Sequence, residues 1–286
     1  MSSLAPQWSS GARLRMLAKR LLVEPFSAVG VHLELTRELT RRDVLGRYRG
    51  ANFGLLWTIL GPLLMLVIYT IAFGEILGAR WQQNGSRDVP FGLVLFLGIA
   101  VHGFVAECLV RSPRLMIDNA NYVKRVVFPL HILPWTIVLS AAFHFLMQIF
   151  VFVVLAAVIA GKLSPWLPAI ALLMVPLSLL TLTACLLLSS IGVYLRDLGL
   201  IIPVLVTALL FLSSAIIPVD TLDPKYQAVF RLNPLTFFID QIRDIALWGN
   251  SPDWSGLVVR TVLGVVLVCL AHAWFKLAGR GFADVI

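Results

Sequence analysis

The sequence predicts an all-α polytopic membrane protein. We expect six transmembrane helices, an N-terminal amphipathic interface helix, and two short re-entrant helices on the outer side between helices 5 and 6. The 286 residues are 59% hydrophobic and 13% charged, whereas about a quarter of the residues in soluble proteins carry a charge. The mean hydropathy is +0.90. Uncharged stretches of membrane length recur along the chain and leave little room for a soluble catalytic domain.

Two segments precede the first span. Residues 1–27 contain basic side chains and an apolar stretch that acidic and proline residues interrupt, which is too short for a cleaved secretory signal. We therefore expect a cytoplasmic tail there. Residues 28–50 are expected to form the interface helix and its lead-in, because Val31, Leu35 and Leu39 recur every four residues while charges occupy the other faces. An ordinary soluble helix packed on another surface is the alternative.

The six-helix domain is expected at 51–286. A span needs about 20 mostly apolar residues, because a helix rises about 1.5 Å per residue and the hydrocarbon core is about 30 Å thick. The expected spans lie within residues 53–73, 89–106, 126–161, 163–195, 198–219 and 254–275. Proline suits a first helical turn and disfavours a helix interior. The third and fourth spans are therefore expected to start near Pro134 and Pro165.

The distribution of positive charge predicts the orientation. Most of the 23 lysines and arginines lie before the first span, between spans two and three, and near the C-terminus. Positively charged loops are retained on the inner side of a membrane. We therefore expect both termini in the cytoplasm and the chain in a bacterial inner membrane. The same distribution explains the net charge of +8 without a nucleic-acid partner.

The longest inner loop, at 111–129, is expected to contain a short helix. Ser112 can cap a helix and Pro113 suits its first position, while residues 119–121 are expected to break it. A short helix across the inner face would suit the coupling loop of a transporter, although any ordered loop could contain one.

The loop at 218–250 is rich in apolar residues, yet charges interrupt it too often for a clean crossing. We expect two short helices, at about 224–232 and 234–247, that dip into the outer leaflet. Irregular backbone survives at that depth only where protein or a water-filled cavity surrounds it. An amphipathic hairpin resting on the outer surface is the alternative.

Catalytic and nucleotide-binding motifs are missing from the sequence. It contains no G-x-x-x-x-G-K-[ST], H-E-x-x-H or G-x-S-x-G pattern, and its five histidines and three cysteines lack metal-ligand or disulfide spacing. We therefore expect no enzyme activity, cofactor or metal in this chain. ATP and magnesium would bind to a separate partner subunit.

Ionisable residues inside a bilayer are costly and often functional. Glu75 and Glu107 lie toward span ends, where an interfacial charge is the alternative to a functional role. His144 lies nearer mid-span. It could act as a proton relay, and a hydrogen-bonded histidine in the core is the alternative. A proton-coupled carrier normally places carboxylates near the midplane. The sequence offers no clear candidate, which disfavours that class.

Aromatic residues on the first span are further candidates for a functional role. Trp57, Tyr69 and Phe73 could line the passage of a carbohydrate chain, because sugar rings stack their C–H faces on aromatic rings. Packing or a place in the interfacial belt is the alternative for each of these rings.

Several short motifs occur in a recognisable order. They read RDVLGRYRG at 42–50, GLLW at 54–57, NYVKR at 121–125, YLRDL at 194–198, SSAIIP at 213–218 and LNPL at 232–235. This order resembles the membrane subunit of ABC type-2 exporters of lipid-linked polysaccharide, the family that handles O-antigen, capsule and teichoic acid. The resemblance runs from about residue 31 to the end of the chain.

The resemblance implies a permease that forms a homodimer and pairs with two copies of a separate ATPase. It assigns the ATPase contacts to Glu38, Arg41, Arg42, Ser112, Arg114, Asp118, Asn121 and Lys124. Tyr48 and Arg49 would lie at the inner mouth, where a cation could meet the pyrophosphate of a lipid carrier. The outer gate would contain Asn233, Pro234, Asp240 and Arg243.

The leading functional hypothesis is ATP-driven export of a lipid-linked polysaccharide from cytoplasm to periplasm, with O-antigen slightly ahead of capsule. A type-2 ABC exporter of drugs or small lipids is the alternative within the same class. A membrane-integral enzyme of glycolipid synthesis is a different class, and it would need polar catalytic residues that converge near an interface.

Overall fold

The computed structural model describes residues 24–27, 30–78, 89–124, 128–160 and 163–286, and throughout this part of the chain the regular structure is helical. The elements are α2 (Leu33–Arg47), η1 (Gly54–Leu56), α3 (Trp57–Tyr69), η2 (Thr70–Ile76), α4 (Phe91–Arg111), η3 (Ser112–Arg114), α5 (Leu115–Asp118), α6 (Ala120–Val123), α7 (Ile132–Ala160), α8 (Ala169–Tyr194), α9 (Leu198–Phe211), η4 (Val219–Thr221), α10 (Pro224–Leu232), α11 (Pro234–Arg243), η5 (Asp244–Trp248), α12 (Trp254–Ala278), η6 (Gly279–Gly281) and α13 (Phe282–Val285).

Among the described residues, five helical segments are long and apolar enough to cross a membrane. They are Gly54–Ile76, Phe91–Asp118, Ile132–Val158, Ala169–Tyr194 and Trp254–Val285. The chain is therefore a multi-pass membrane protein. Helix α9 has 14 residues, which corresponds to about 21 Å and falls short of the ~30 Å hydrocarbon core. The sixth crossing stays a prediction.

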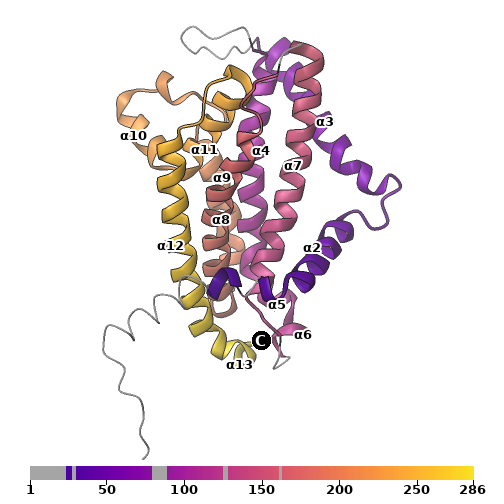
Figure 1. Ribbon diagram of the computed structural model, residues 1–286, viewed down its shortest axis with the longest axis vertical. Coiled ribbons are helices and arrows are strands. Elements are labelled where there is room, and N and C mark those ends of the chain that lie inside the picture. Colours follow the sequence, from indigo (N-terminus) through magenta and orange to yellow (C-terminus); the bar gives the residue numbers. More distant parts are fainter. Residues whose placement is uncertain (1–23, 28–29, 79–88, 125–127, 161–162) are drawn as a thin grey trace, which may run out of the picture.

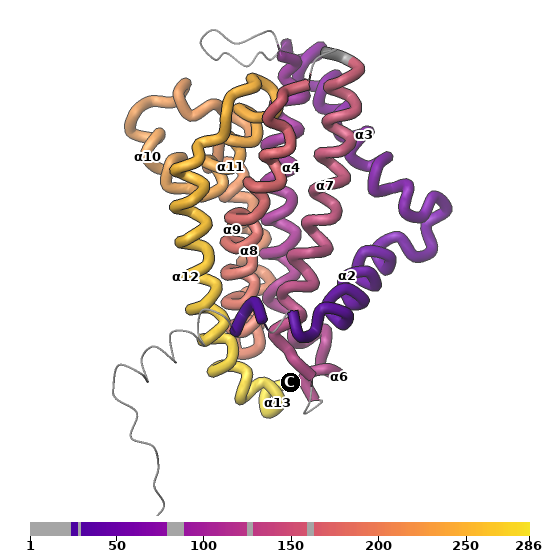
Figure 2. The backbone as a smooth tube through the Cα atoms, viewed as in Figure 1, coloured from indigo at the N-terminus to yellow at the C-terminus, as the bar shows by residue number. Residues whose placement is uncertain are grey.

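The long helices stand roughly parallel and form one bundle (Figure 1). Helix α8 packs along α12, α4 packs against α7, and α2 also packs on α7. Helices α2, α5, α6 and α13 gather at one end of the bundle, hereafter the α2 end. Helices α10 and α11 lie at the opposite end, the α10 end (Figure 2). Helix α2 and the start of α3 project from the bundle as a V (Figure 1).

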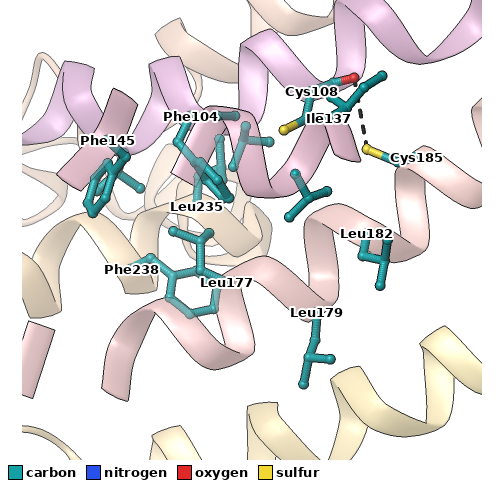
Figure 3. Close-up of a cluster of buried hydrophobic side chains, with 14 of the residues drawn as sticks. Phe104, Cys108, Ile137, Phe145, Leu177, Leu179, Leu182, Cys185, Leu235 and Phe238 are labelled. Atoms are coloured by element: carbon teal, nitrogen blue, oxygen red, sulfur yellow. Dashed lines mark hydrogen bonds between the residues drawn. The ribbon is translucent and has the colours of Figure 1, made fainter. Parts of the chain in front are cut away.

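The core between the helices is apolar (Figure 3). The rings of Phe104 on α4 and Phe145 on α7 lie 5.9 Å apart between centroids. The thiol of Cys185 on α8 approaches the carbonyl oxygen of Cys108 on α4 at 3.9 Å. All three cysteines are free and buried, which agrees with their expected role as small apolar residues.

Two tryptophans mark the ends of the crossing made by α12. Trp254 and Trp274 are 20 residues apart on this helix, a separation of about 30 Å that matches the hydrocarbon core. Tryptophan is enriched at membrane–water interfaces. The segment before residue 261 therefore belongs to this crossing, as the sequence predicts. The guanidinium of Arg260 lies over the ring of Phe237, 3.3 Å from its centroid.

The described end of the predicted tail is anchored to the bundle. Residues 24–27 are helical, and the Glu24 carboxylate accepts a hydrogen bond from Lys276 Nζ at 2.5 Å. The ring of Phe26 lies 6.1 Å from that of Trp135 at the start of α7. Residues 1–23 of the predicted tail lie outside the described residues.

Helix boundaries differ from the prediction in two of the connections between spans. Helix α8 begins at Ala169, later than the expected start near Pro165, because residues 165–168 form a turn first. Ser112 does not begin a new helix, because α4 continues through η3 into α5. Its hydroxyl donates back to the carbonyl of Cys108 at 2.6 Å. The expected break at 119–121 is confined to Asn119, and α6 begins one residue later.

The two helices predicted between spans five and six are present as helices. Helix α10 matches its expected range, and α11 continues through the π-helical η5 to Trp248. The fifth span is shorter than predicted, because helical structure ends at Phe211 and turns follow to residue 217. Whether α10 and α11 enter the membrane stays a prediction.

Side chains from α11 and its N-cap explain why α9 ends early. The Asn233 amide donates to the carbonyls of Leu209 and Leu212, both at 3.0 Å. Arg243, which is 1% exposed, donates to the carbonyls of Ser214 at 2.6 Å and Ala215 at 2.7 Å. These bonds supply partners for carbonyls that a helix terminus leaves without an intrahelical donor.

Arg243 also donates from Nε to the carbonyl of Val94 on α4, at 3.0 Å. Gly98, one turn further along α4, leaves the space that the guanidinium occupies. A Cβ at this position would lie 2.5 Å from Arg243 Nη2 and 2.8 Å from the carbonyl oxygen of Ala215.

We therefore expect Gly98→Ala to destabilise the α10 end by about 1–3 kcal/mol, because overpacking there displaces Arg243 from its carbonyl partners. Thermal unfolding of the purified chain in detergent measures the effect. Gly103→Ala on the same helix is the matched control, since its Cβ would meet no atom within 4 Å. Equal midpoints for the two variants would contradict this account of the Arg243 site.

Candidate functional site

A cavity of about 380 Å³ lies between α3, α4, α7 and the end of α2. Three residues singled out from the sequence, Tyr48, Trp57 and Tyr69, line it together. Arg49 and Phe73 do not line it. The ring of Phe73 instead packs 5.8 Å from that of Phe91, between centroids. The structure thus brings part of the predicted inner mouth and part of the predicted aromatic path into one site.

Polar side chains form one wall of the cavity. Tyr48 Oη lies 3.4 Å from His144 Nδ1 on α7, and Gln148 follows one turn along the same helix. His144 is 8% exposed. His144 Nε2 and Gln148 Oε1 are buried and have no hydrogen-bond partner among the described residues. Buried polar atoms normally have a partner, so this wall has unused hydrogen-bonding capacity.

An ion-pair network joins α2 to α4 beside the cavity. Glu107 on α4 accepts from Arg47 Nη1 at 3.1 Å, and its other oxygen is paired with Arg47 Nη2. Arg111 bridges Glu107 at 3.1 Å and Asp43 on α2 at 2.5 Å. Arg47 and Glu107 also line the cavity. The network therefore fixes the end of α2 to the mouth of the cavity.

Asp43 is held in its ionised form. Burial raises the pKa of its carboxyl group, but the hydrogen bond from Arg111 and the charges of Arg111 and Arg47 lower it by more. The resulting pKa lies below its ordinary value of 3.8. The contribution of Asp43 to stability is therefore present above about pH 4 and is lost as the pH falls below the depressed pKa.

The predicted ATPase contacts gather at the α2 end (Figure 1). The guanidinium carbon of Arg42 on α2 lies 5.9 Å from the ring centroid of Tyr122 on α6, so the helix and the loop adjoin. The exposed members of this set are Glu38, Arg41, Arg42, Arg114, Asp118, Asn121 and Lys124. Ser112 is fully buried. Its side chain could therefore influence such a contact only through its neighbours, and the ATPase contacts stay a prediction.

The predicted gate residues gather at the α10 end. Asn233 caps α11 by accepting from the Leu235 amide at 3.0 Å, and Pro234 takes the first helical position. Asp240 lies on α11 three residues before Arg243, and the Ser214 hydroxyl donates to the Thr236 carbonyl on the same helix at 3.4 Å. The four residues thus lie in one structural unit around the end of α9. A gating role for them stays a prediction.

Comparison with known proteins identifies the family of this chain. Residues 34–247 match the model of the ABC-2 type transporter family. The chain belongs to this family. It is therefore the membrane subunit of an ABC transporter and not an enzyme, and its ATPase is a separate subunit.

Three curated relatives cover most of the chain. It is 24% identical to the O-antigen export system permease protein RfbA of Klebsiella pneumoniae, over 90% of this chain and 97% of the relative. It is 25% identical to the RfbA protein of Myxococcus xanthus, over 87% and 94%. The polysialic acid transport protein KpsM of Escherichia coli is 24% identical, over 82% and 90%.

Sequence reasoning missed two members of the site. Arg47 was recognised only as a basic residue in a motif, and Gln148 was not recognised at all. Glu107 and His144 were recognised as possible functional residues, and a structural role was the alternative for each. The spacing of His144 and Gln148, four residues apart on one helix face, was the available signal.

We expect Arg111→Gln to loosen the attachment of α2, because it leaves Asp43 without its guanidinium partner. Removing one partner of a partly buried ion pair should cost about 1–3 kcal/mol. The thermal unfolding midpoint of the purified chain at pH 7 measures the loss.

Arg41→Gln is the matched control, since the Arg41–Glu38 pair spans 3.8 Å between side chains that are 69% and 70% exposed. Such surface pairs contribute about 0–1 kcal/mol. As the pH falls from about 4 through the depressed pKa of Asp43, the difference between Arg111→Gln and the unaltered chain should shrink, because the carboxylate that Arg111 pairs with becomes protonated. A midpoint for Arg111→Gln equal to that of Arg41→Gln at pH 7 would contradict the proposed role of the network.

Proposed function

We propose that this chain is the permease of an exporter that moves a lipid-linked polysaccharide, with O-antigen ahead of capsule, from the cytoplasm to the periplasm. The cavity between α3, α4 and α7 is the observation that carries the proposal. Its aromatic residues Tyr48, Trp57 and Tyr69 offer faces on which sugar rings can stack, and His144 and Gln148 offer hydrogen bonds for hydroxyl groups. The names of the relatives support the same class of substrate.

The lipid carrier would meet a second, more open hollow at the α2 end. Its lining includes Arg42, Arg47 and Arg111, with Asp43 as the acidic residue. Arginine suits bidentate contacts with phosphate oxygens. The pyrophosphate of the carrier would therefore bind near these arginines, which replace Arg49 in our assignment, while Tyr48 remains at the adjoining cavity.

The topology proposed for this function has six crossings, with α9 as the short fifth one. Both termini lie in the cytoplasm, α2 lies along the inner surface, and α10 and α11 enter the outer leaflet as a gate. The positive charge at the α2 end supports this orientation in a bacterial inner membrane.

The assembly would be a homodimer with two ATPase subunits, which bind ATP and magnesium. In the 18-residue apolar stretch within Gly54–Ile76, only 11% is buried inside this chain, against 67% in the corresponding stretch of Phe91–Asp118. The apolar surface of α3 therefore faces lipid or a second copy. Exposed apolar patches of this kind are typical of interaction sites.

An exporter of drugs or small lipids is the competing proposal. The cavity volume of about 380 Å³ lies within the range of roughly 300–1,000 Å³ that is typical of small-molecule sites. The two proposals differ in what a deletion strain would accumulate.

Deleting the gene should trap polysaccharide on the cytoplasmic side and remove it from the cell surface, because this chain would provide the passage. Antibody labelling of intact and permeabilised cells measures the two pools, and the sugar composition of the trapped polymer identifies it. A strain whose partner ATPase lacks its nucleotide-binding lysine is the control and should behave alike. Normal surface polymer together with increased drug sensitivity would favour the competing proposal.

A further inference from the structure

Arg260 is a charged residue inside the crossing made by α12. It follows Trp254, which marks one end of this crossing, by six residues, or about 9 Å along the helix axis. Helical side chains lean toward the N-terminus of their helix. Accordingly, Arg260 Nη1 donates to the carbonyl of Gly256 at 3.2 Å, one turn nearer to Trp254. A charge at this depth is costly unless it reaches the interface or a partner.

Helix α11 holds the guanidinium in place. The guanidinium carbon lies 3.3 Å from the centroid of the Phe237 ring, which is a cation–π contact. Gly256 makes room for this ring, since a Cβ there would lie 2.9 Å from Phe237 Cε2. Gln241 on α11 also accepts a hydrogen bond from the Asp253 amide at 2.8 Å. Helices α11 and α12 therefore adjoin around Arg260 (Figure 1).

Most donors of this guanidinium are unused within the chain. Among the described residues, the bond to Gly256 is its only hydrogen bond, and no carboxylate forms an ion pair with it. Arg231 at the same end, by contrast, pairs with Asp220 at 3.7 Å. A guanidinium has several N–H donors in a planar fork. Those of Arg260 are therefore available to an anion outside the chain.

Arg260 borders a surface that is open to lipid. It is half-buried, and its neighbours Val259 and Leu263 are 64% and 52% exposed. They belong to a row of exposed apolar side chains that continues along α12: Val258, Val259, Val262, Leu263, Val266 and Leu270. A lipid whose acyl chains lie along this row would bring its headgroup to the level of Trp254, because tryptophan lies at the membrane–water interface.

Phosphate is the anion that suits this position. Its oxygens accept paired hydrogen bonds from the fork of a guanidinium. A phospholipid supplies a phosphate at the interface together with acyl chains for the apolar row. It therefore matches both the charge of Arg260 and the exposed surface beside it.

We infer that Arg260 and Phe237 form a binding site for the phosphate group of a membrane phospholipid, whose acyl chains lie along the exposed row of α12. The bound lipid neutralises the guanidinium and fastens α11 to α12. This site does not depend on which substrate the transporter moves.

Lipid-dependent stability tests the inference. The full chain is purified in an uncharged detergent without phosphate, and its thermal unfolding midpoint is measured as dioleoyl phosphatidylglycerol is added. This lipid should raise the midpoint, because a ligand of the folded state stabilises it. Dioleoylglycerol has the same acyl chains but no phosphate, and inorganic phosphate has no acyl chains. Each of these two reference ligands should leave the midpoint unchanged.

Variants identify the side chains that hold the phosphate. Arg260→Gln should raise the half-saturating concentration of phosphatidylglycerol about tenfold or more, since it removes charge-assisted hydrogen bonds. Phe237→Leu should shift it in the same direction, because the guanidinium loses its platform. Arg231→Gln is the matched control, since it removes the same charge from an exposed ion pair at the same end. Its response should equal that of the unaltered chain.

Several outcomes would overturn the site. Equal responses of Arg260→Gln and Arg231→Gln to phosphatidylglycerol would show that the guanidinium is not involved. A response of the unaltered chain to inorganic phosphate alone would indicate a free anion, and an equal response to dioleoylglycerol would indicate a purely apolar lipid contact. These two comparisons need no variant, so they decide the question even if Arg260→Gln does not fold. Polyprenyl diphosphate that half-saturates at a tenth of the phosphatidylglycerol concentration or less would assign the site to the lipid carrier instead.

Discussion

Backbone carbonyls that would otherwise lack a hydrogen-bond donor constrain the α10 end of this protein. A helix terminus leaves its last carbonyls without intrahelical donors, and a buried carbonyl without any donor is costly. Asn233 and Arg243 supply donors to four carbonyls between Leu209 and Ala215. Because these donors come from α11 and its cap, the short helix α9 and the α10–α11 unit depend on each other. Gly98 is needed for the same arrangement, since any larger residue would occupy the volume of the Arg243 guanidinium.

Charged side chains make the corresponding connection at the α2 end. The chain Asp43–Arg111–Glu107–Arg47 alternates in sign and links α2 to α4 twice. Arg47 and Tyr48 line the cavity and follow directly on the exposed face that carries Arg41 and Arg42. A force applied to that face by a partner would therefore reach the cavity wall through a short, cross-linked segment of helix.

The sequence predicted the parts of this structure that follow from local pattern. Hydropathy located the long crossings, and Asn233-Pro234 located the start of α11, because a cap and a first-turn proline act within a few residues. The early end of α9 was missed, since it depends on Arg243, more than 30 residues away in the sequence. Ser112 looked like a helix start, but the continuation of α4 decides its role. Tyr48, Trp57 and Tyr69 of the cavity were found from the sequence, whereas Arg47 and Gln148 required knowing which helices surround it.

The distribution of hydrogen bonds at the α10 end also determines how that end could separate from the bundle. Of the bonds made by Asn233 and Arg243, those to residues 209–215 lie within the α9–α11 unit, whereas the bond from Arg243 Nε to Val94 crosses to α4. Hydrogen bonds to charged groups contribute about 1.5–3 kcal/mol each. Moving α9 and α11 together away from α4 would break at least two bonds, that from Arg243 Nε to Val94 and that from His102 Nε2 on α4 to the Val206 carbonyl on α9. Separating α9 from α11 would break the four bonds to residues 209–215. Among the described residues, more hydrogen bonds therefore join α9 to α11 than join this unit to α4.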